Sequence, residues 1–161
     1  MYYDHGDTAI DASVAATKGF FETEDGNLDW LADIDILVAS PDCIAQLLIE
    51  IEERPCSPKK ILGDTLAILL SNRLAVHVHR EERMIFKISP DTLLIVAGVV
   101  PDSGHRLKTI NDVIDPQIHR LEGLTDGISP KNVQYVFNKM IEDTFEKLDS
   151  IVATKLAERG A

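Results

Sequence analysis

An uninterrupted apolar run at residues 92–100 (TLLIVAGVV) limits the folds that are open to this chain. Turn-forming residues 101–104 (PDSG) end the run, so it has the length of a β-strand and is too short to span a membrane. A strand that is apolar on both sides needs cover on both faces, which is typical of a central strand. We therefore expect an α/β fold with a small mixed β-sheet flanked by helices.

Hydrophobic periodicity and turn residues predict the remaining elements. Residues 57–72 are expected to form a helix that is buried on most sides, with Ser57 as its N-cap and Pro58 in its first turn. The other predicted elements are helices at 11–21, near 110–121 and from 129 to about 158, and strands at 33–38, 74–78 and 84–88.

The segment 44–53 fits two structures. The turn residues Ser40-Pro41-Asp42 can join it to the strand at 33–38, which makes it the second strand of a hairpin. The same turn is also a good helix start, and the apolar residues that would then share one helical face are Ile44, Leu47, Leu48 and Ile51. We interpret the segment as a strand because of the elements that surround it, and a helix remains the alternative.

Composition narrows the class of protein. The 161 residues fit one α/β domain, 1–161, with 45% hydrophobic residues to build its core, in which we expect Trp30 and the five Phe. No run of 18 apolar residues occurs, and the N-terminus lacks the pattern of a secretory signal. Cys43 and Cys56 have no spacing that suits a disulfide framework or zinc. A cytoplasmic protein without a membrane partner is therefore expected.

The negative charge is concentrated in one part of the sequence. The formal net charge is −11, and residues 1–55 hold 13 acids against two bases, while the remainder of the chain is balanced. A nonspecific electrostatic contact of this first third with nucleic acid is disfavoured. The acids can form a solvated face, bind a divalent cation or meet a basic protein partner, and the sequence leaves these three open.

The predicted hairpin would gather four of these acids. If Ala39 lies opposite Ile44, Asp33 faces Glu50, and residues two apart share a face of the sheet. The carboxylates of Asp33, Asp35, Glu50 and Glu52 would then share one face, with isoleucines on the other.

Opposed carboxylates destabilise a sheet. Their β-carbons would be about 5 Å apart, and each close pair costs on the order of 4 kcal/mol before screening at an effective dielectric constant of 20. Splayed side chains, a protonated carboxyl group or a bound cation would each relieve this repulsion. Hard oxygen ligands at this density suit Mg²⁺, Mn²⁺ or Ca²⁺, whereas an ordinary acidic sheet edge is the structural alternative.

The hairpin sequence also resembles that of a known superfamily. Residues 32–38 (ADIDILV) and 48–53 (LIEIEE) look like the active-site hairpin of the PD-(D/E)XK nucleases, and the helix at 58–72 and the strand at 93–97 follow in that family's order. The resemblance covers about residues 11–100, with a helical part at about 105–161. It implies a restriction-endonuclease-like three-layer core, followed here by a long C-terminal helix.

The resemblance implies a set of site residues. Asp33 or Asp35 would be the metal-ligating aspartate, Glu50 matches the (D/E) position, and Ile51 could supply a backbone carbonyl to the metal. Glu52 stands at the position where the family usually has lysine. Some restriction enzymes also have glutamate at this position. Lys59 or Lys60, at the start of the next helix, could replace the missing cation, although exposed lysines are common on a first turn.

The activity implied is metal-dependent hydrolysis of DNA phosphodiester bonds with Mg²⁺ or Mn²⁺, in which Glu52 could act as a general base. One alternative is a non-enzymatic acidic α/β protein, of the inhibitor or immunity type, that binds a basic protein. Another is a catalytically inactive relative of the nuclease fold. The C-terminal helix can pack on its own domain or form a homodimer, which would let each subunit cut one strand of a duplex.

Overall fold

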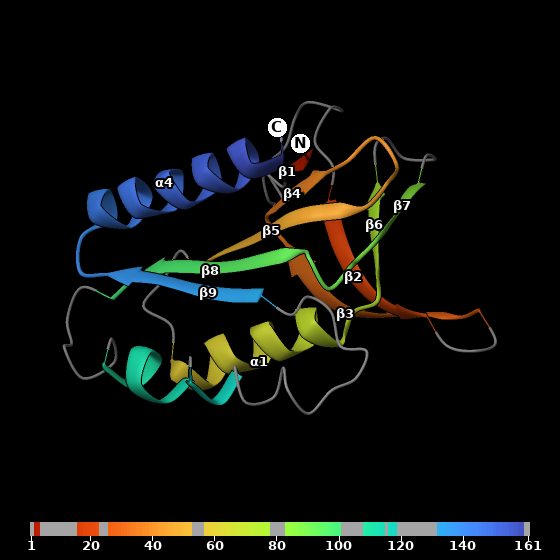
Figure 1. Ribbon diagram of the computed structural model, residues 1–161. Coiled ribbons are helices and arrows are strands. Elements are labelled where there is room, and N and C mark those ends of the chain that lie inside the picture. The colour runs from red at the N-terminus through yellow and green to blue at the C-terminus, as the bar shows by residue number, and fades with distance from the viewer. Residues whose placement is uncertain are drawn as a thin grey trace, which may run out of the picture.

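The computed structural model in Figure 1 describes residues 2–3, 16–22, 26–52, 57–77, 83–100, 108–114, 116–118 and 132–159. Over these residues the chain is a mixed α/β structure with two small sheets and helices on their faces. Its elements are β1 (Tyr2–Tyr3), β2 (Ala16–Glu22), β3 (Leu28–Ile34), β4 (Ile36–Ala39), β5 (Ala45–Glu52), α1 (Pro58–Leu70), β6 (Arg73–His77), β7 (Arg83–Lys87), β8 (Leu93–Val99), the π-helical turn η2 (Ile110–Ile114), β9 (Asn132–Asn138) and α4 (Ile141–Arg159).

The larger sheet has the strand order β1-β4-β5-β8-β9. β4 and β5 form the antiparallel hairpin that the sequence predicts, and the strand interpretation of the segment 44–53 is confirmed. β8 pairs in parallel with both β5 and β9, and all but the last of its residues are buried, as expected of a central strand. α1 connects β5 to the second sheet, and it begins as predicted, with Ser57 as its N-cap.

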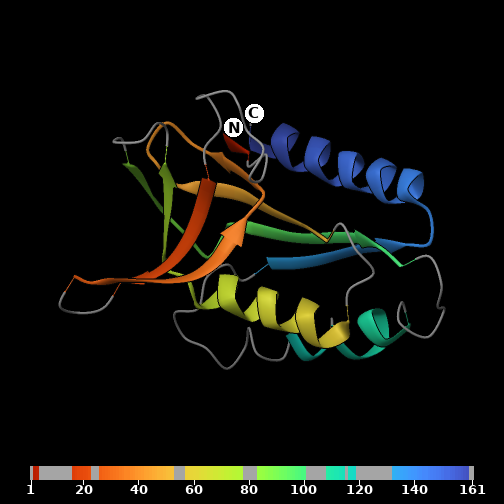
Figure 2. The same cartoon turned by 180° about the vertical axis from the view of Figure 1, so that it is seen from behind.

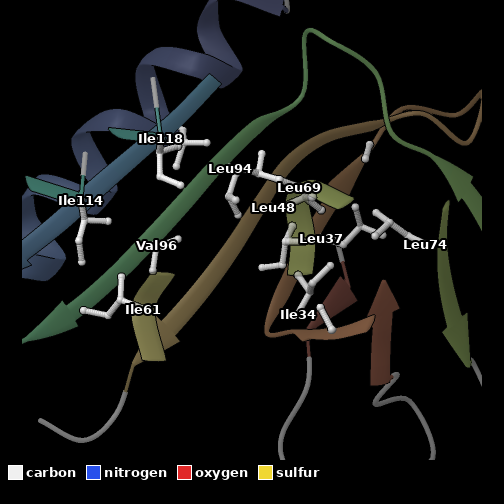
Figure 3. Packing of buried hydrophobic residues seen from close by; sticks show 14 of the residues in the cluster. Ile34, Leu37, Leu48, Ile61, Leu69, Leu74, Leu94, Val96, Ile114 and Ile118 are labelled. Carbon is white, nitrogen blue, oxygen red and sulfur yellow. The ribbon is translucent and has the colours of Figure 1, made fainter. Parts of the chain in front are cut away.

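Helices cover both faces of this sheet. Figures 1 and 2 show α1 on one side of β8 and β9, and α4 on the other. The alternation of β5 divides its side chains between two cores, because Leu48 packs toward α1 whereas Leu47 and Ile49 pack toward Leu148 of α4. The core on the α1 side is shared with the second sheet, and Figure 3 shows it with Ile34 and Leu74 close to Leu37, Leu48 and Leu94.

The second sheet was not expected from the sequence. Its strand order is β3-β2-β6-β7, so the strands predicted at 74–78 and 84–88 are present but belong to a separate antiparallel sheet. The helix predicted at 11–21 is wrong over its described part, because residues 16–22 form strand β2. β2 lies between β3 and β6, and these two long-range pairings override the local helical preference of its alanine-rich start.

The long C-terminal helix predicted from residue 129 is also wrong at its start. Residues 132–138 form strand β9 at the edge of the larger sheet, and α4 begins only at Ile141. The C-terminal part is therefore not wholly helical. Val133 and Phe137 are four residues apart, a spacing that places two side chains on one face of a strand as well as on one face of a helix. The short helix predicted near 110–121 is present as helical turns at 108–114 and 116–118.

The aromatic residues do not all lie in the core. Phe20, Phe86 and Phe137 are buried, but Trp30 is 59% exposed and Phe145 is 46% exposed. The expectation that Trp30 and every Phe are core residues is therefore wrong. Among the described residues, no helix combines the length and the apolar character that a membrane crossing requires.

We predict that Gly98→Ala destabilises the protein. A β-carbon at Gly98 would lie 2.7 Å from Cε1 of Phe137 and 3.0 Å from Cβ of Glu52, so both neighbours must shift. Chemical denaturation should show a loss of about 1–3 kcal/mol in the free energy of unfolding. Gly63→Ala is the control, because its added methyl group meets nothing within 4 Å on an exposed turn of α1 and should stabilise the helix by about 0.5–1 kcal/mol. Equal effects of the two substitutions would contradict this packing.

Candidate functional site

The register of the β4–β5 hairpin differs from the predicted one. Ile36 pairs with Ile49, two residues away from the expected alignment. One residue of this shift arises because Ala39 pairs with Ala45 instead of Ile44, and the other arises from a bulge between Val38 and Ala39. Cys43 in the turn has a positive φ of 56°, and a Ser40 N–H bond to the Ile44 carbonyl closes the turn at 2.9 Å. A shift by two residues keeps the faces, so Glu50 and Glu52 still point together toward α1, while the aspartate brought level with Glu50 is Asp35.

Asp35 lies at the break between β3 and β4. Its Oδ2 accepts a hydrogen bond of 2.6 Å from the backbone N–H of Ile51, so its side chain takes the place of a backbone partner just before β4 begins. This bond joins the β3–β4 junction to the carboxyl end of β5. The carboxylate of Asp35 is consequently held beside Glu50, whose pKa it raises.

Glu50 is a carboxyl group in a half-buried position without a full set of partners. Its Oε2 is buried and has no hydrogen-bond partner among the described residues. Burial, followed by the nearby carboxylates of Asp35, Glu52 and Asp64, raises the pKa of Glu50 to about 8, although the ammonium of Lys60 acts in the opposite direction. At neutral pH this side chain is therefore protonated unless a cation is bound beside it.

Glu52 is paired with a lysine from the next helix. Its side chain is 6% exposed, and the Nζ of Lys60 lies 2.8 Å from both of its carboxylate oxygens. Lys60 Nζ also lies 2.8 Å from Oδ2 of Asp64, one turn further along α1. Burial raises the pKa of Glu52, and the hydrogen bonds from Lys60 counteract part of this effect.

The start of α1 explains why Lys60 reaches Glu52. Oγ of Ser57 accepts a bond from the Lys60 N–H at 3.3 Å, so the cap fixes Lys60 in the first turn, directly after the chain returns from β5. A lysine in the first turn opposes the helix dipole. Burial would lower the pKa of Lys60, but the hydrogen bonds to Asp64 and Glu52 outweigh burial and raise it. The contact with the carboxylates thus compensates for an unfavourable helix position.

The structure brings together four of the predicted site residues, Asp35, Glu50, Glu52 and Lys60, which with Asp64 we call the carboxylate cluster. Asp33 does not join them. It lies on β3 in the second sheet, is largely exposed and forms an ion pair of 3.1 Å with Lys18, so the expectation that it faces Glu50 is wrong.

Two further predicted residues lie beside the carboxylate cluster without a role in its bonding. Lys59 is exposed on the first turn of α1 and forms no ion pair within the part of the chain that the structure describes. Ile51 takes part through its N–H, which binds Asp35, and its side chain packs in the core on the α4 side. The role of its carbonyl as a metal ligand stays a prediction.

Asp64 was not predicted as a site residue. The sequence pattern that could have identified it is the spacing of four residues between Lys60 and Asp64, which places oppositely charged side chains on one face of a helix. Gly98 was also missed. It lies directly beside Glu52 in the parallel β5–β8 pair, where a side chain would push against the glutamate.

The chemistry of the carboxylate cluster suits a hard divalent cation. Four carboxylates against one ammonium leave a formal charge of −3 when all are ionised, and Oε2 of Glu50 lacks a partner. In this conformation no three His, Cys, Asp or Glu side chains among the described residues are arranged to hold a metal ion. The ligand types fit, but Glu52 faces Lys60, so a complete ligand set requires a rearrangement.

Comparisons with known proteins identify no relative. No protein-family model matches the chain, and searches of curated proteins and of solved structures give no match.

We predict a pH-dependent stability that depends on Glu50. Its pKa is about 8 in the folded protein and about 4.5 in the unfolded chain, so the folded state holds more protons between these values. The free energy of unfolding should therefore fall as the pH rises from 5 to 9, with a contribution from Glu50 of up to roughly 4 kcal/mol. Urea denaturation monitored by circular dichroism, with a chelator present, measures this slope.

The control is Glu50→Gln, which keeps the shape and removes the titration. Its free energy of unfolding should fall much less over the same pH range. Parallel pH profiles for the wild-type protein and the variant would contradict the raised pKa of Glu50.

Proposed function

We propose that this protein is a divalent-metal-dependent nuclease that hydrolyses DNA phosphodiester bonds, with Mg²⁺ or Mn²⁺ as its cofactor. The observation that supports this most strongly is the convergence of Asp35, Glu50 and Glu52 beside Lys60 at the carboxyl end of β5. This convergence, together with the order β5, α1, β8, is what the PD-(D/E)XK resemblance implies.

Each residue of the carboxylate cluster has a distinct proposed role. Asp35 and Glu50 would hold the cation, because Asp35 is anchored to the backbone of Ile51 and Glu50 has a carboxylate oxygen without a partner. The cation would supply positive charge at the phosphate and make a water molecule more acidic. Glu52 would accept the proton of the attacking water once it is released from its pairing.

Lys60 would supply the cation that the motif lacks. The family usually has lysine where this chain has Glu52, and Lys60 Nζ lies 2.8 Å from the Glu52 carboxylate, so its charge is available at the same place. Its three N–H groups now contact Glu52 and Asp64, and its side chain is 56% exposed, so a phosphate group could reach the ammonium once it is released from Glu52. Between the two lysines that the sequence offered, the geometry favours Lys60 over Lys59.

A second candidate function is binding of a basic protein partner without catalysis. Phe21, Trp30 and Leu31 are exposed large hydrophobic side chains on β2 and β3, and the acids Asp29 and Asp33 are exposed on the same strand pair. Figure 2 shows these two strands extending from the body of the molecule. Lys18 lies 4.2 Å from the centre of the Trp30 ring and pairs with Asp33, so a cationic side chain already occupies this surface, and the cation of a basic protein could contact it in the same way.

A homodimer through α4 would place two such sites on one duplex. The exposed residues Ile141 and Leu156 are equally distant from the point between Leu148 and Asp149 on α4. The exposed Phe145 and the half-buried Val152 are also equally distant from that point, and Val152 packs in addition against the core on the α4 side. Two copies of α4 packed antiparallel would therefore place like contacts on both sides of a two-fold axis. This spacing supports the dimer as part of the proposal.

The nuclease proposal predicts metal-dependent nicking of plasmid DNA. With Mn²⁺ or Mg²⁺, Asp35→Asn and Glu50→Gln should each lower the rate on the order of 100-fold or more, because each removes a ligand charge. Millimolar metal should also raise the melting temperature of the wild-type protein, and Glu50→Gln should abolish that rise.

Asp33→Asn is the matched control, since it makes the same change two residues from Asp35 but on the exposed strand β3. It should keep the wild-type nicking rate. Nicking that is unaffected by Glu50→Gln, or a melting temperature that is unchanged by metal, would contradict the proposal and favour the basic protein partner.

For the dimer, we predict that light scattering at micromolar concentration gives about twice the 17.8 kDa chain mass. Phe145→Glu should give a monomer, because it places a charge in the apolar strip of α4. Ala157→Glu is the control, as it is exposed on the same helix but about 120° away from Phe145. A monomeric wild-type protein would end the dimer proposal.

A further inference from the structure

We propose that Lys60 is a resident cation that occupies Glu52 until a divalent cation displaces it, and that Asp64 retains the displaced ammonium group. This inference rests on the proposed function, because it assigns a regulatory role to residues of the same site. It concerns how the carboxylate cluster accepts its metal, and it adds Asp64 as a positioning residue.

Both carboxylate oxygens of Glu52 are occupied by Lys60. Lys60 Nζ lies 2.8 Å from Oε1 and 2.8 Å from Oε2, so both carboxylate oxygens are engaged by one ammonium group. Each carboxylate oxygen keeps a further lone pair, but the positive charge of the ammonium beside both oxygens repels a divalent cation that approaches this part of the carboxylate cluster. The absence of any ready group of three metal ligands among the described residues agrees with this.

Glu52 cannot relieve its charge by turning toward solvent. Its side chain is 6% exposed, and its Cβ and carbonyl are packed against Gly98 of β8. A buried carboxylate of this kind needs a positive partner in the folded protein. Lys60 or a bound metal ion can fill that need, and their positive charges compete for the same carboxylate.

Asp64 gives Lys60 a partner that it keeps after displacement. Asp64 Oδ2 lies 2.8 Å from the same Nζ and is one helical turn away, so Lys60 loses the ion pair with Glu52 but retains the one with Asp64. The flexible stem of a lysine allows this movement without a change in the backbone of α1. Asp64 thereby lowers the cost of releasing Glu52, and it keeps the ammonium beside the place where a phosphate would bind.

The experiment is a calorimetric titration of the full chain with Mn²⁺ alone, in the absence of DNA. Lys60→Met should bind Mn²⁺ at least about tenfold more tightly than the wild-type protein, because a competing cation is removed. Without metal, Lys60→Met should melt several degrees lower than the wild-type protein, since Glu52 is left buried without its partner. Circular dichroism at the titration temperature shows whether the variant is folded.

Lys59→Met is the matched control, because it removes the same charge from the same turn of α1. It should change the Mn²⁺ affinity by less than about threefold, which separates competition at Glu52 from the general effect of net charge. Lys60→Arg gives a second test that preserves the ion pair, and it should bind Mn²⁺ no more tightly than the wild-type protein does.

Asp64 is tested by comparing two backgrounds. Asp64→Asn should weaken Mn²⁺ binding in the wild-type protein, because Lys60 then has no carboxylate partner left after it leaves Glu52. In Lys60→Met the same substitution should have little further effect. An equal loss in both backgrounds would assign Asp64 a direct electrostatic role and would overturn its role as the retaining residue.

The outcomes separate this inference from the proposed function. If the wild-type protein and Lys60→Met both fail to bind Mn²⁺, the proposed function fails and this inference fails with it. If the wild-type protein binds Mn²⁺ and Lys60→Met binds it no more tightly than Lys59→Met does, only the resident-cation proposal is overturned.

Discussion

Burial of negative charge at the carboxyl end of β5 is the constraint on which the site depends. Ile49 and Ile51 fill the core on the α4 side, so the alternation of the strand directs Glu50 and Glu52 toward α1. Lys60 partly compensates this negative charge, and the Ser57 cap places it in the first turn of the following helix. One ammonium does not neutralise four carboxylates, and this surplus charge is the reason why we propose a divalent cation as the partner of the carboxylate cluster.

Departures from ordinary structural rules gather at this one place. Glu50 has a buried oxygen without a partner, Lys60 lies at the end of a helix that disfavours cations, and Gly98 interrupts the side chains of a central strand. Each of these features lowers stability by itself. Folded proteins keep such features mainly where function requires them. Their coincidence around Glu52 supports a functional site more strongly than any one of them does.

The sequence predicted the parts of the fold that local patterns determine. The capped helix α1, the buried strand β8 and the hairpin β4–β5 were expected, and the structure contains all three. The pairing of Glu50 with Asp35 instead of Asp33 depends on a bulge beside Ala39, which has no clear pattern in the sequence. β2 and β9 were mistaken for helices because their strand character comes from neighbouring strands, and the spacing of Val133 and Phe137 fits both periodicities. Asp64 was missed because its importance follows from the position of Lys60.

The most direct test of the account is a crystal structure of the protein grown with millimolar Mn²⁺, with anomalous scattering used to locate the ion. The account predicts an anomalous peak within bonding distance of Asp35 and Glu50, with the Lys60 ammonium withdrawn from Glu52 and still bound to Asp64. A crystal in which Mn²⁺ is absent from these carboxylates, while Lys60 still binds both oxygens of Glu52, would contradict it.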